Sequence, residues 1–291
     1  MRVRNNIHRQ QLFHWIGKGI EKKSSGNSRK LNDDQREEYV SHLRTSLESG
    51  LWMTRPSTEQ VTVGKESFSQ ELPITCFTEW SLDRSTPHTL TYGRLGLGFP
   101  KNIILIKGGQ PVSYFKSTGA RRLYASAMID LLRHFEAHQH SRAEKNLFVE
   151  LQYVLSFSRA IKSPTEPGLI GKATRPRPVG KKKATRVTKH RKTIKVDRFA
   201  RRFGLRLDLA EEREWRVVYH PDLEKSKLVR RGPGKPPYLI PYKPGVELFT
   251  VALPDNRTVN MVMGNKFFLR EFFGPSRPHV TVVSLQDVGT F

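Results

Sequence analysis

The sequence is poor in cysteine, in long hydrophobic runs and in acidic residues. A single cysteine, Cys76, excludes an internal disulfide bond and a zinc site built from several cysteines. The longest purely aliphatic run, Ile103 to Ile106, is far shorter than the roughly 20 apolar residues that a bilayer span requires. The N-terminus does not lead into the apolar segment of a secretory signal. We therefore expect a cytoplasmic protein with no membrane partner.

The shortage of acidic residues leaves a strong positive charge. The chain has 51 Lys+Arg against 27 Asp+Glu, a net charge of +24. Residues 172–206 hold fifteen Lys/Arg and one acid, Asp197, so this segment carries +14 and the rest of the chain +10. Such a segment is either a solvated insertion or a contact surface for a polyanion, of which nucleic acid is the commonest. We favour nucleic acid.

The remaining composition is that of a globular protein. Hydrophobic residues make up 36% and charged residues 27%, and 291 residues are enough to bury a sizeable core. We expect one domain over 1–291 of the α+β class, with a helical insertion at 116–162 and a basic, partly flexible insertion at 163–206. The sequence contains no internal repeat.

An acidic stretch at 211–220 is the most informative local feature. Three carboxylates, Glu211, Glu212 and Glu214, run into an apolar segment with strand character. In an extended chain, Glu212 and Glu214 share one face. Neighbouring carboxylates repel, so one pKa should rise unless a cation or a ligand hydroxyl lies between them. The pattern fits a functional site, and it also fits a solvated turn before a strand.

The pattern of apolar residues predicts the secondary structure. We expect strands at 12–16, 73–79, 92–99, 112–115 and 280–284, and a helix that begins at Asn32 or Asp33 and ends at Gly50. The glycines of the 92–99 segment predict a strand whose backbone is closely approached by another group. Segments 248–253 and 258–263, on either side of Pro254, have the form of a β-hairpin.

The helical insertion shows two amphipathic patterns. The first helix has Leu123, Ala127, Leu131 and Phe135 on one stripe, and the second has Leu147, Leu151, Val154 and Leu155. Core packing is the expected role of both stripes. The nearby His134, His138 and His140 suggest a metal site, but Glu136 does not adjoin the first histidine as in a His-Glu-x-x-His site. We expect no metal.

Three stretches, taken together, resemble a known family. They are Phe13-His14-Trp15-Ile16-Gly17, then Cys76-Phe77-Thr78-Glu79 with His88 and Tyr92-Gly93-Arg94-Leu95-Gly96-Leu97-Gly98-Phe99, and finally Glu212-Arg213-Glu214-Trp215-Arg216. In this order they resemble the AbiGi-type abortive-infection family of bacterial phage-defence proteins, from about residue 10 to the C-terminus. The family's usual label, the antitoxin of a two-gene pair, implies a binding protein and a cognate toxin–antitoxin partner.

The order of these motifs also resembles the ADP-ribosyltransferase fold, which implies a split β-sheet core and NAD as substrate. Carried over by that resemblance, His14 contacts the NAD ribose, Tyr92 stacks on nicotinamide, and Arg94, Gly17 and Thr78 complete the cofactor-binding set. Glu214 and Glu212 are the catalytic pair. One departure is that Trp15 and Ile16 stand where the fold has small residues after the histidine.

The chemistry of an ADP-ribosyl transfer suits these residue types. Cleavage of the nicotinamide–ribose bond develops positive charge on the sugar, which the carboxylate of Glu214 would stabilise. Glu212 would orient or deprotonate the incoming nucleophile. From the residues alone, His14 is equally well a core histidine and Tyr92 a packing aromatic, whereas Arg94 is better explained as a surface cation.

The basic segment indicates nucleic acid as the acceptor. Its cations can follow a phosphate backbone without reading the sequence. Chemistry on a base favours single strands, because a paired base must first be unstacked. We therefore expect RNA, or single-stranded DNA, with RNA favoured. The expected contacts are Lys181, Lys182, Lys183, Arg186, Lys189, Arg191 and Lys192, together with Arg175 and Arg177.

Three functions remain open from the sequence. The first, which we favour at this point, is an NAD-dependent ADP-ribosyltransferase toxin of an anti-phage system that modifies nucleic acid. The second is a non-catalytic antitoxin or regulator with the same fold that binds nucleic acid and a toxin. The third is a nuclease that uses the glutamates with a divalent metal.

Overall fold

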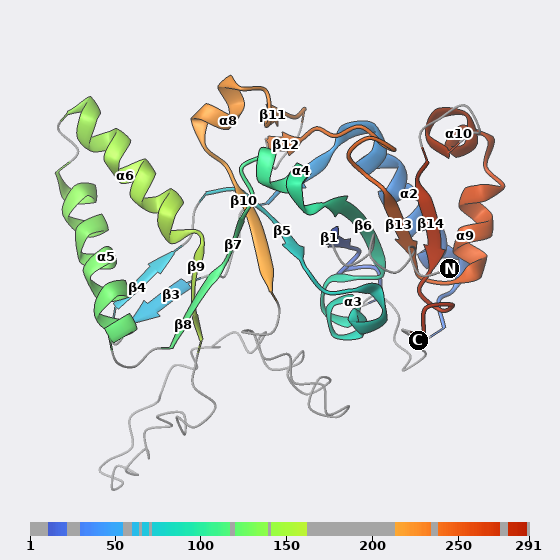
Figure 1. Ribbon diagram of the computed structural model, residues 1–291, viewed down its shortest axis with the longest axis horizontal. Helices are drawn as coiled ribbons and strands as arrows, with labels where there is room; N and C mark the ends of the chain where they lie inside the picture. Colours follow the sequence, from blue (N-terminus) through green and yellow to red (C-terminus); the bar gives the residue numbers. More distant parts are fainter. Residues whose placement is uncertain are drawn as a thin grey trace, which may run out of the picture.

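The computed structural model of the protein describes residues 11–21, 30–54, 60–63, 66–69, 72–116, 120–138, 141–161, 213–233, 238–273 and 279–289. These residues form a mixed α+β structure with a central sheet and several helices (Figure 1), which confirms the expected class. The segment 163–206, with the expected nucleic-acid contacts, lies outside the described residues, as does Glu212.

The central sheet has seven strands in the order β14-β13-β6-β1-β5-β10-β7. Neighbouring strands are antiparallel except β13 and β14, which are parallel. The strands are β1 (Gln11–Ile16), β5 (Ile74–Thr78), β6 (Leu95–Pro100), β7 (Gln110–Pro111), β10 (Glu214–Val218), β13 (Thr250–Leu253) and β14 (Thr281–Ser284).

Shorter strands form smaller sheets beside this one. A three-stranded sheet joins β2 (Leu51–Met53), β12 (Tyr238–Ile240) and β11 (Arg230–Arg231). Two further pairs are β3 (Gln60–Val63) with β4 (Glu66–Ser69), and β8 (Ser113–Lys116) with β9 (Ser158–Ile161).

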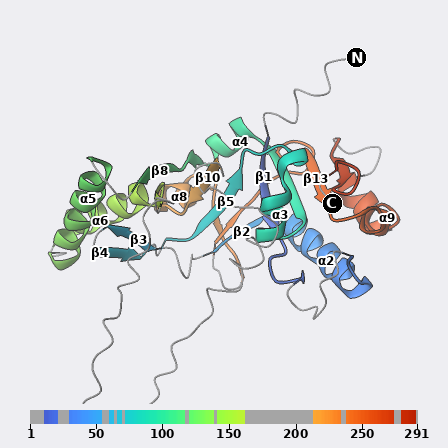
Figure 2. The ribbon, with the colours of Figure 1, turned by 90° about the horizontal axis from the view of Figure 1, so that it is seen from below.

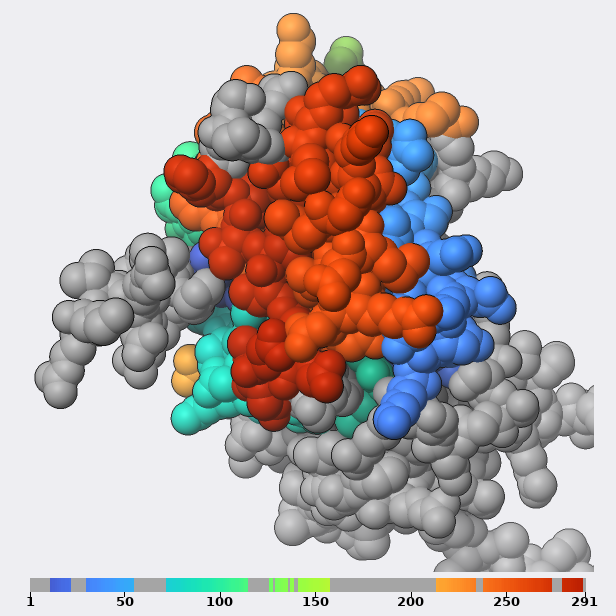
Figure 3. Space-filling view, turned by 90° about the vertical axis from the view of Figure 1, so that its right-hand side faces the viewer, coloured from blue at the N-terminus to red at the C-terminus, as the bar shows by residue number. Residues whose placement is uncertain are grey.

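One face of the central sheet is covered by α2 (Asp33–Ser49) and α9 (Asn256–Met263), which belong to the larger apolar core. Helix α2 begins where predicted, because Asn32 and Gln35 form a capping box. It ends at Gly50, whose φ of 100° favours glycine. Arg36 of α2 forms an ion pair of 2.9 Å with Asp255, the N-cap of α9. The two helices, far apart in sequence, lie side by side at the surface (Figure 3).

The other face carries a smaller apolar cluster of Phe13, Trp15, Leu82, Ala252 and Leu285. The predicted close approach to the glycine-containing strand is confirmed here. The rings of Trp15 and Phe13 lie over Gly96 and Gly98, where a Cβ atom would collide with them. Helix η3 (Leu82–Arg84) and helix α3 (Thr86–Tyr92) follow β5, so the strand predicted from residue 92 begins only at Leu95.

The helical insertion contains α5 (Ala120–Ala137) and α6 (Arg142–Leu155), which stand with β3, β4 and β8 at one end of the molecule, whereas α2 and α9 stand at the other (Figure 2). The prediction that both apolar stripes are core is wrong in part. Leu155 is buried, but Leu131, Leu147 and Val154 are exposed. Among the side chains of α5 that the structure describes, Ile129 and Leu132 are buried, and they fall on another stripe of that helix.

The predicted β-hairpin at 248–263 is wrong. Its first half is β13, but its second half is α9. The side chain of Asp255 accepts a hydrogen bond of 2.8 Å from the backbone N–H of Thr258, which caps a helix start. Asp255 stands between two apolar segments. A polar residue in that position is typical of a turn, and it is equally typical of a helix N-cap.

The remaining helices of the described residues are short. They are α4 (Lys101–Ile106), α8 (Pro221–Lys225), α10 (Lys266–Phe268) and the π-helix η5 (Leu269–Phe273). Within the described ranges, none of the helices combines the length and the apolarity needed to cross a membrane.

Candidate functional site

Glu214, the residue expected to be catalytic, is the first residue of β10. Arg213 has a φ of 42°, so the backbone is not extended at the residue before Glu214 and the alternation assumed for Glu212 and Glu214 does not apply. Instead, Glu214 shares a face with Arg216, two residues later on the strand. The Arg216 guanidinium donates from Nε to Glu214 Oε1 at 2.9 Å and from Nη2 to Oε2 at 3.3 Å. The side chains are 9% and 2% exposed, so this is a buried, bidentate ion pair.

Arg216 also joins two parts of the molecule. Its Nη1 donates a hydrogen bond of 2.7 Å to the backbone carbonyl of Ser156, at the carboxyl end of α6. Tyr114 donates from its hydroxyl to Glu214 Oε2 at 3.4 Å. The Glu214 carboxylate is therefore enclosed between the central sheet and the helical insertion. Sequence reasoning missed Arg216, although the Glu-x-Arg spacing on a strand places the two side chains together.

His14 lies on the opposite face of the sheet from Glu214. The register pairs Phe13 with Thr78 and Thr78 with Glu214, so these three side chains share one face. His14, next to Phe13, points to the other face and contacts the ring of Phe77 in the larger core. Its Nδ1 donates to the Cys76 carbonyl at 2.8 Å, and burial lowers its pKa. The structure thus does not bring His14 and Glu214 together.

Thr78 and Tyr92 do lie on the side of Glu214, gathered around His88. His88 Nε2 lies 3.4 Å from Thr78 Oγ1, and its ring stacks on Tyr92 at 6.1 Å between centroids. Trp80 contacts the same imidazole edge-on at 5.0 Å. Burial lowers the pKa of His88 to about 4, although the charge of Glu214 acts in the opposite direction. His88 is thus a neutral, buried side chain at neutral pH.

His88 was not among the residues predicted for the site. The signal was present, because His88 and Tyr92 are four residues apart and share one face of α3. The spacing alone does not show that this face of α3 is buried, because the burial of His88 depends on tertiary packing.

Arg94 and Gly17 lie in a separate region of the protein, beside Tyr39 of α2. Arg94 Nε lies 2.9 Å from Glu21 Oε1, and the same carboxylate oxygen accepts from the Tyr39 hydroxyl at 2.7 Å. Burial, with the Glu21 charge, raises the pKa of Tyr39. Gly17 has a φ of 109° and lies against the Tyr39 ring. Arg94, predicted as part of the cofactor-binding set, therefore has an internal carboxylate partner in Glu21.

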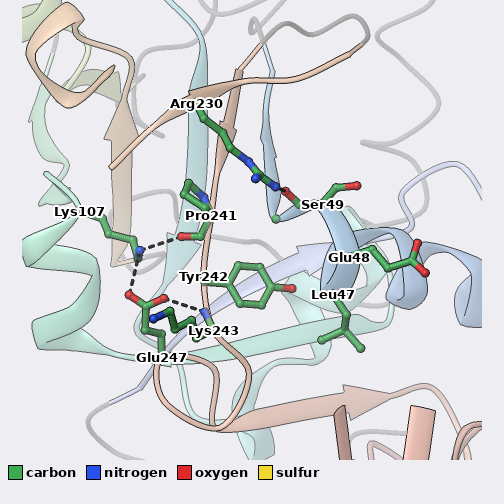
Figure 4. Close-up of a pocket in the computed structure, with 10 residues that line it drawn as sticks. Leu47, Glu48, Ser49, Lys107, Arg230, Pro241, Tyr242, Lys243 and Glu247 are labelled. Atoms are coloured by element: carbon green, nitrogen blue, oxygen red, sulfur yellow. Dashed lines mark hydrogen bonds and ion pairs between the residues drawn. The ribbon is translucent and has the colours of Figure 1, made fainter. Parts of the chain in front are cut away.

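A cleft of about 440 Å³ lies elsewhere, at the carboxyl end of α2 (Figure 4). None of the residues predicted for NAD binding or catalysis lines it. Its lining comes from α2, the end of α4, β11 and the loop after β12, and comprises Leu47, Glu48, Ser49, Gly50, Lys107, Arg230, Pro241, Tyr242, Lys243 and Glu247.

Comparison with known proteins finds one family model that matches part of the chain. Residues 33–165 match the family model described as "Putative abortive phage resistance protein AbiGi, antitoxin". The resemblance to the AbiGi family is therefore confirmed over 33–165, a range that contains Thr78, His88 and Tyr92 but neither His14 nor Glu214. No curated protein and no solved structure matches the chain.

The favoured interpretation as an ADP-ribosyltransferase toxin is wrong, because the matched family is described as an antitoxin. The geometry agrees with this correction, since Glu214 is paired with Arg216 and His14 lies on the other face. The binding of NAD to Tyr92 and Thr78 stays a prediction that no observation tests.

Proposed function

We propose that the chain is a non-catalytic antitoxin or regulator of an abortive-infection pair, which binds and neutralises a cognate toxin. The observation that carries the proposal is the match of 33–165 to the AbiGi antitoxin family. In this proposal an ADP-ribosyltransferase-like core serves as a binding scaffold rather than as an enzyme.

The surroundings of Glu214 support a structural rather than a catalytic role for its carboxylate. A carboxylate that stabilises a developing sugar cation has to direct its charge at the substrate. Here both Glu214 oxygens accept hydrogen bonds from the guanidinium of Arg216, which in turn holds the end of α6. This arrangement uses the charge of Glu214 to join the sheet to the helical insertion.

Expression in bacteria tests the proposal. The chain produced alone should leave growth unchanged, whereas the protein of the neighbouring gene produced alone should arrest it. Production of both together should restore growth. Growth arrest by this chain alone, or failure to relieve the arrest caused by its neighbour, would contradict the proposal.

We further propose that the regulator contacts nucleic acid through 172–206, with Lys181, Lys182, Lys183, Arg186, Lys189, Arg191 and Lys192 at the phosphates. The support is the charge of this segment, +14 from fifteen cations and one acid. Its affinity for single-stranded RNA should fall steeply with salt, and replacement of these seven residues by Gln should flatten the slope of log K against log salt concentration. Equal slopes for both proteins would count against the contact.

A further inference from the structure

Ile106 and Val246, the two most exposed large aliphatic side chains of the described residues, adjoin in sequence Lys107 and Glu247, which line the cleft at the end of α2. Ile106 is 64% exposed and Val246 is 55% exposed, and Leu105 beside Ile106 is 44% exposed. A single exposed aliphatic residue is ordinary. These three come from two separate segments, α4 and the loop after β12, which an ion pair of 2.9 Å between Lys107 and Glu247 holds together. The segments that carry these side chains therefore lie next to each other.

The floor of the cleft is held in place by an ion pair and hydrogen bonds within the protein. The side chain of Lys107, 7% exposed, donates to the Pro241 carbonyl at 2.8 Å and pairs with Glu247 Oε1. Glu247 Oε2 accepts the backbone N–H of Lys243 at 2.7 Å (Figure 4). Tyr242 extends across the cleft toward α2, where its hydroxyl donates to the Ser46 carbonyl at 2.7 Å. A hollow formed in advance costs a ligand less ordering than one that must assemble.

Two cations at the rim have no acidic partner among the residues that the structure describes. Arg230 donates to the Ser49 carbonyl at 2.8 Å, and Lys243 is exposed. Among the described residues, no carboxylate lies within ion-pair distance of either side chain, whereas other exposed cations such as Lys225 and Arg231 have carboxylate partners. The rim is thus positively charged, on a chain with a net charge of +24.

We propose that this surface, made of Leu105, Ile106, Val246, Arg230 and Lys243 and called here the docking face, binds the cognate toxin. This inference rests on the proposed antitoxin function. The partner segment presents one apolar side chain to the cleft and carboxylates on either side of it, which pair with Arg230 and Lys243.

The apolar part of the docking face favours a protein over a nucleic acid. Nucleic-acid surfaces combine cations with aromatic side chains on which bases stack. Ile106, Leu105 and Val246 offer neither a charge nor an aromatic ring. Burial of such side chains against an apolar residue of a partner stabilises a protein–protein complex instead.

Binding of the purified neighbouring-gene protein to the full chain tests the docking face, by calorimetry. Ile106→Asp places a charge in the apolar contact, and Lys243→Glu reverses a rim charge. Each should weaken binding by about 30-fold or more, the range of an interface hot spot. The matched controls are Val154→Asp, which changes an aliphatic residue of α6 that is 46% exposed, and Lys266→Glu, which changes an exposed lysine of α10. Both controls should stay within about twofold of wild type, since surface changes outside the contact have small effects.

The outcomes separate the two proposals. If the wild-type chain does not bind the neighbouring-gene protein, both fail. If it binds but Ile106→Asp and Lys243→Glu bind equally well, the docking face is wrong and the antitoxin function stands. A loss with Lys243→Glu alone, together with weaker binding of a fluorescein-labelled single-stranded RNA, would assign the face to nucleic acid and overturn the inference. If Ile106→Asp fails to fold, the binding measured for Lys243→Glu, a change at an exposed side chain, tests the docking face instead.

Discussion

At Glu214 and Arg216, two buried charges hold together segments that the sequence keeps about 60 residues apart. Removal of water from two ions is costly, and their attraction offsets that cost only with good geometry and further hydrogen bonds. Here the guanidinium makes two bonds to the carboxylate and one to the Ser156 carbonyl. The pair therefore matters for stability mainly because the loss of one partner leaves the other charge buried and unpaired.

Removal of Arg216 alone should be far more harmful than removal of both charges. Arg216→Met leaves the Glu214 carboxylate buried and unpaired, which should lower the free energy of unfolding by about 3–5 kcal/mol. The double variant Glu214→Gln/Arg216→Met should lose less, because no uncompensated charge remains. Denaturation with urea measures both. If the losses of the single variants Arg216→Met and Glu214→Gln add up to the loss of the double variant, the charges do not act as a pair.

His88 should make stability depend on pH. Its pKa is lowered to about 4 in the folded protein, below the value of 6.5 of a free histidine, so the unfolded chain binds more protons between these values. Stability should therefore be lost as the pH falls from about 6.5 to about 4, by at most about 3 kcal/mol from this group.

Unfolding of His88→Gln by urea across this pH range checks the prediction, since this variant should show a smaller loss at low pH. Tyr92→Phe keeps a ring beside His88 and removes no imidazole, so it should retain the wild-type pH dependence. A His88→Gln profile parallel to that of wild type would mean that another group titrates.

At the scale of helices and strands, the sequence was most informative where residues close in sequence decide an element's bounds by themselves. Helix α2 begins at Asn32 and ends at Gly50 as predicted, because a capping side chain and a glycine decide those ends within a few residues. The start of α9 obeys the same rule at Asp255, but the apolar segment after it is compatible with strand or helix. Parallel pairing of β13 with β14 requires a crossover, which α9 supplies.

The cap of α2 gives a prediction at this scale. Asn32→Ala removes the side chain that accepts from the backbone N–H of Gln35 at 2.8 Å, and should destabilise the protein by about 1 kcal/mol. Asn32→Asp keeps an acceptor at the same place and should cost much less. Thermal unfolding measures both variants, and equal melting temperatures for Ala and Asp would argue against capping at this position.

At the scale of the whole molecule, the central sheet has a protected middle and two different edges. Strands β6, β1 and β5 have neighbours on both sides and bury both faces, with α2 and α9 over one and Phe13, Trp15 and Leu82 over the other. The edge strand β7 has two residues and ends in Pro111, which limits pairing with other chains. The helical insertion contacts the sheet near that edge, through Arg216.

Hydrogen exchange should follow this arrangement. Amides of β1, β5 and β6 should exchange slowest, by global unfolding, and those of α5 and α6 faster, because their exposed apolar residues contribute little to the core. Mass spectrometry of peptides after exchange measures the order. Equal protection of the insertion and the central strands would show that they unfold as one unit.

The sequence by itself determined the composition-level properties and the locally coded elements, namely the positive charge, the strand at 12–16, the bounds of α2 and the glycines beneath Trp15 and Phe13. These properties depend on neighbours within a few residues, or on the total composition of the chain. Only the tertiary structure decided which side chains meet. Register placed Glu214 with Thr78 and away from His14, and burial paired Glu214 with Arg216. A motif order fixes neither the face of a sheet nor the partner of a charge, because both depend on strand pairing between residues distant in sequence.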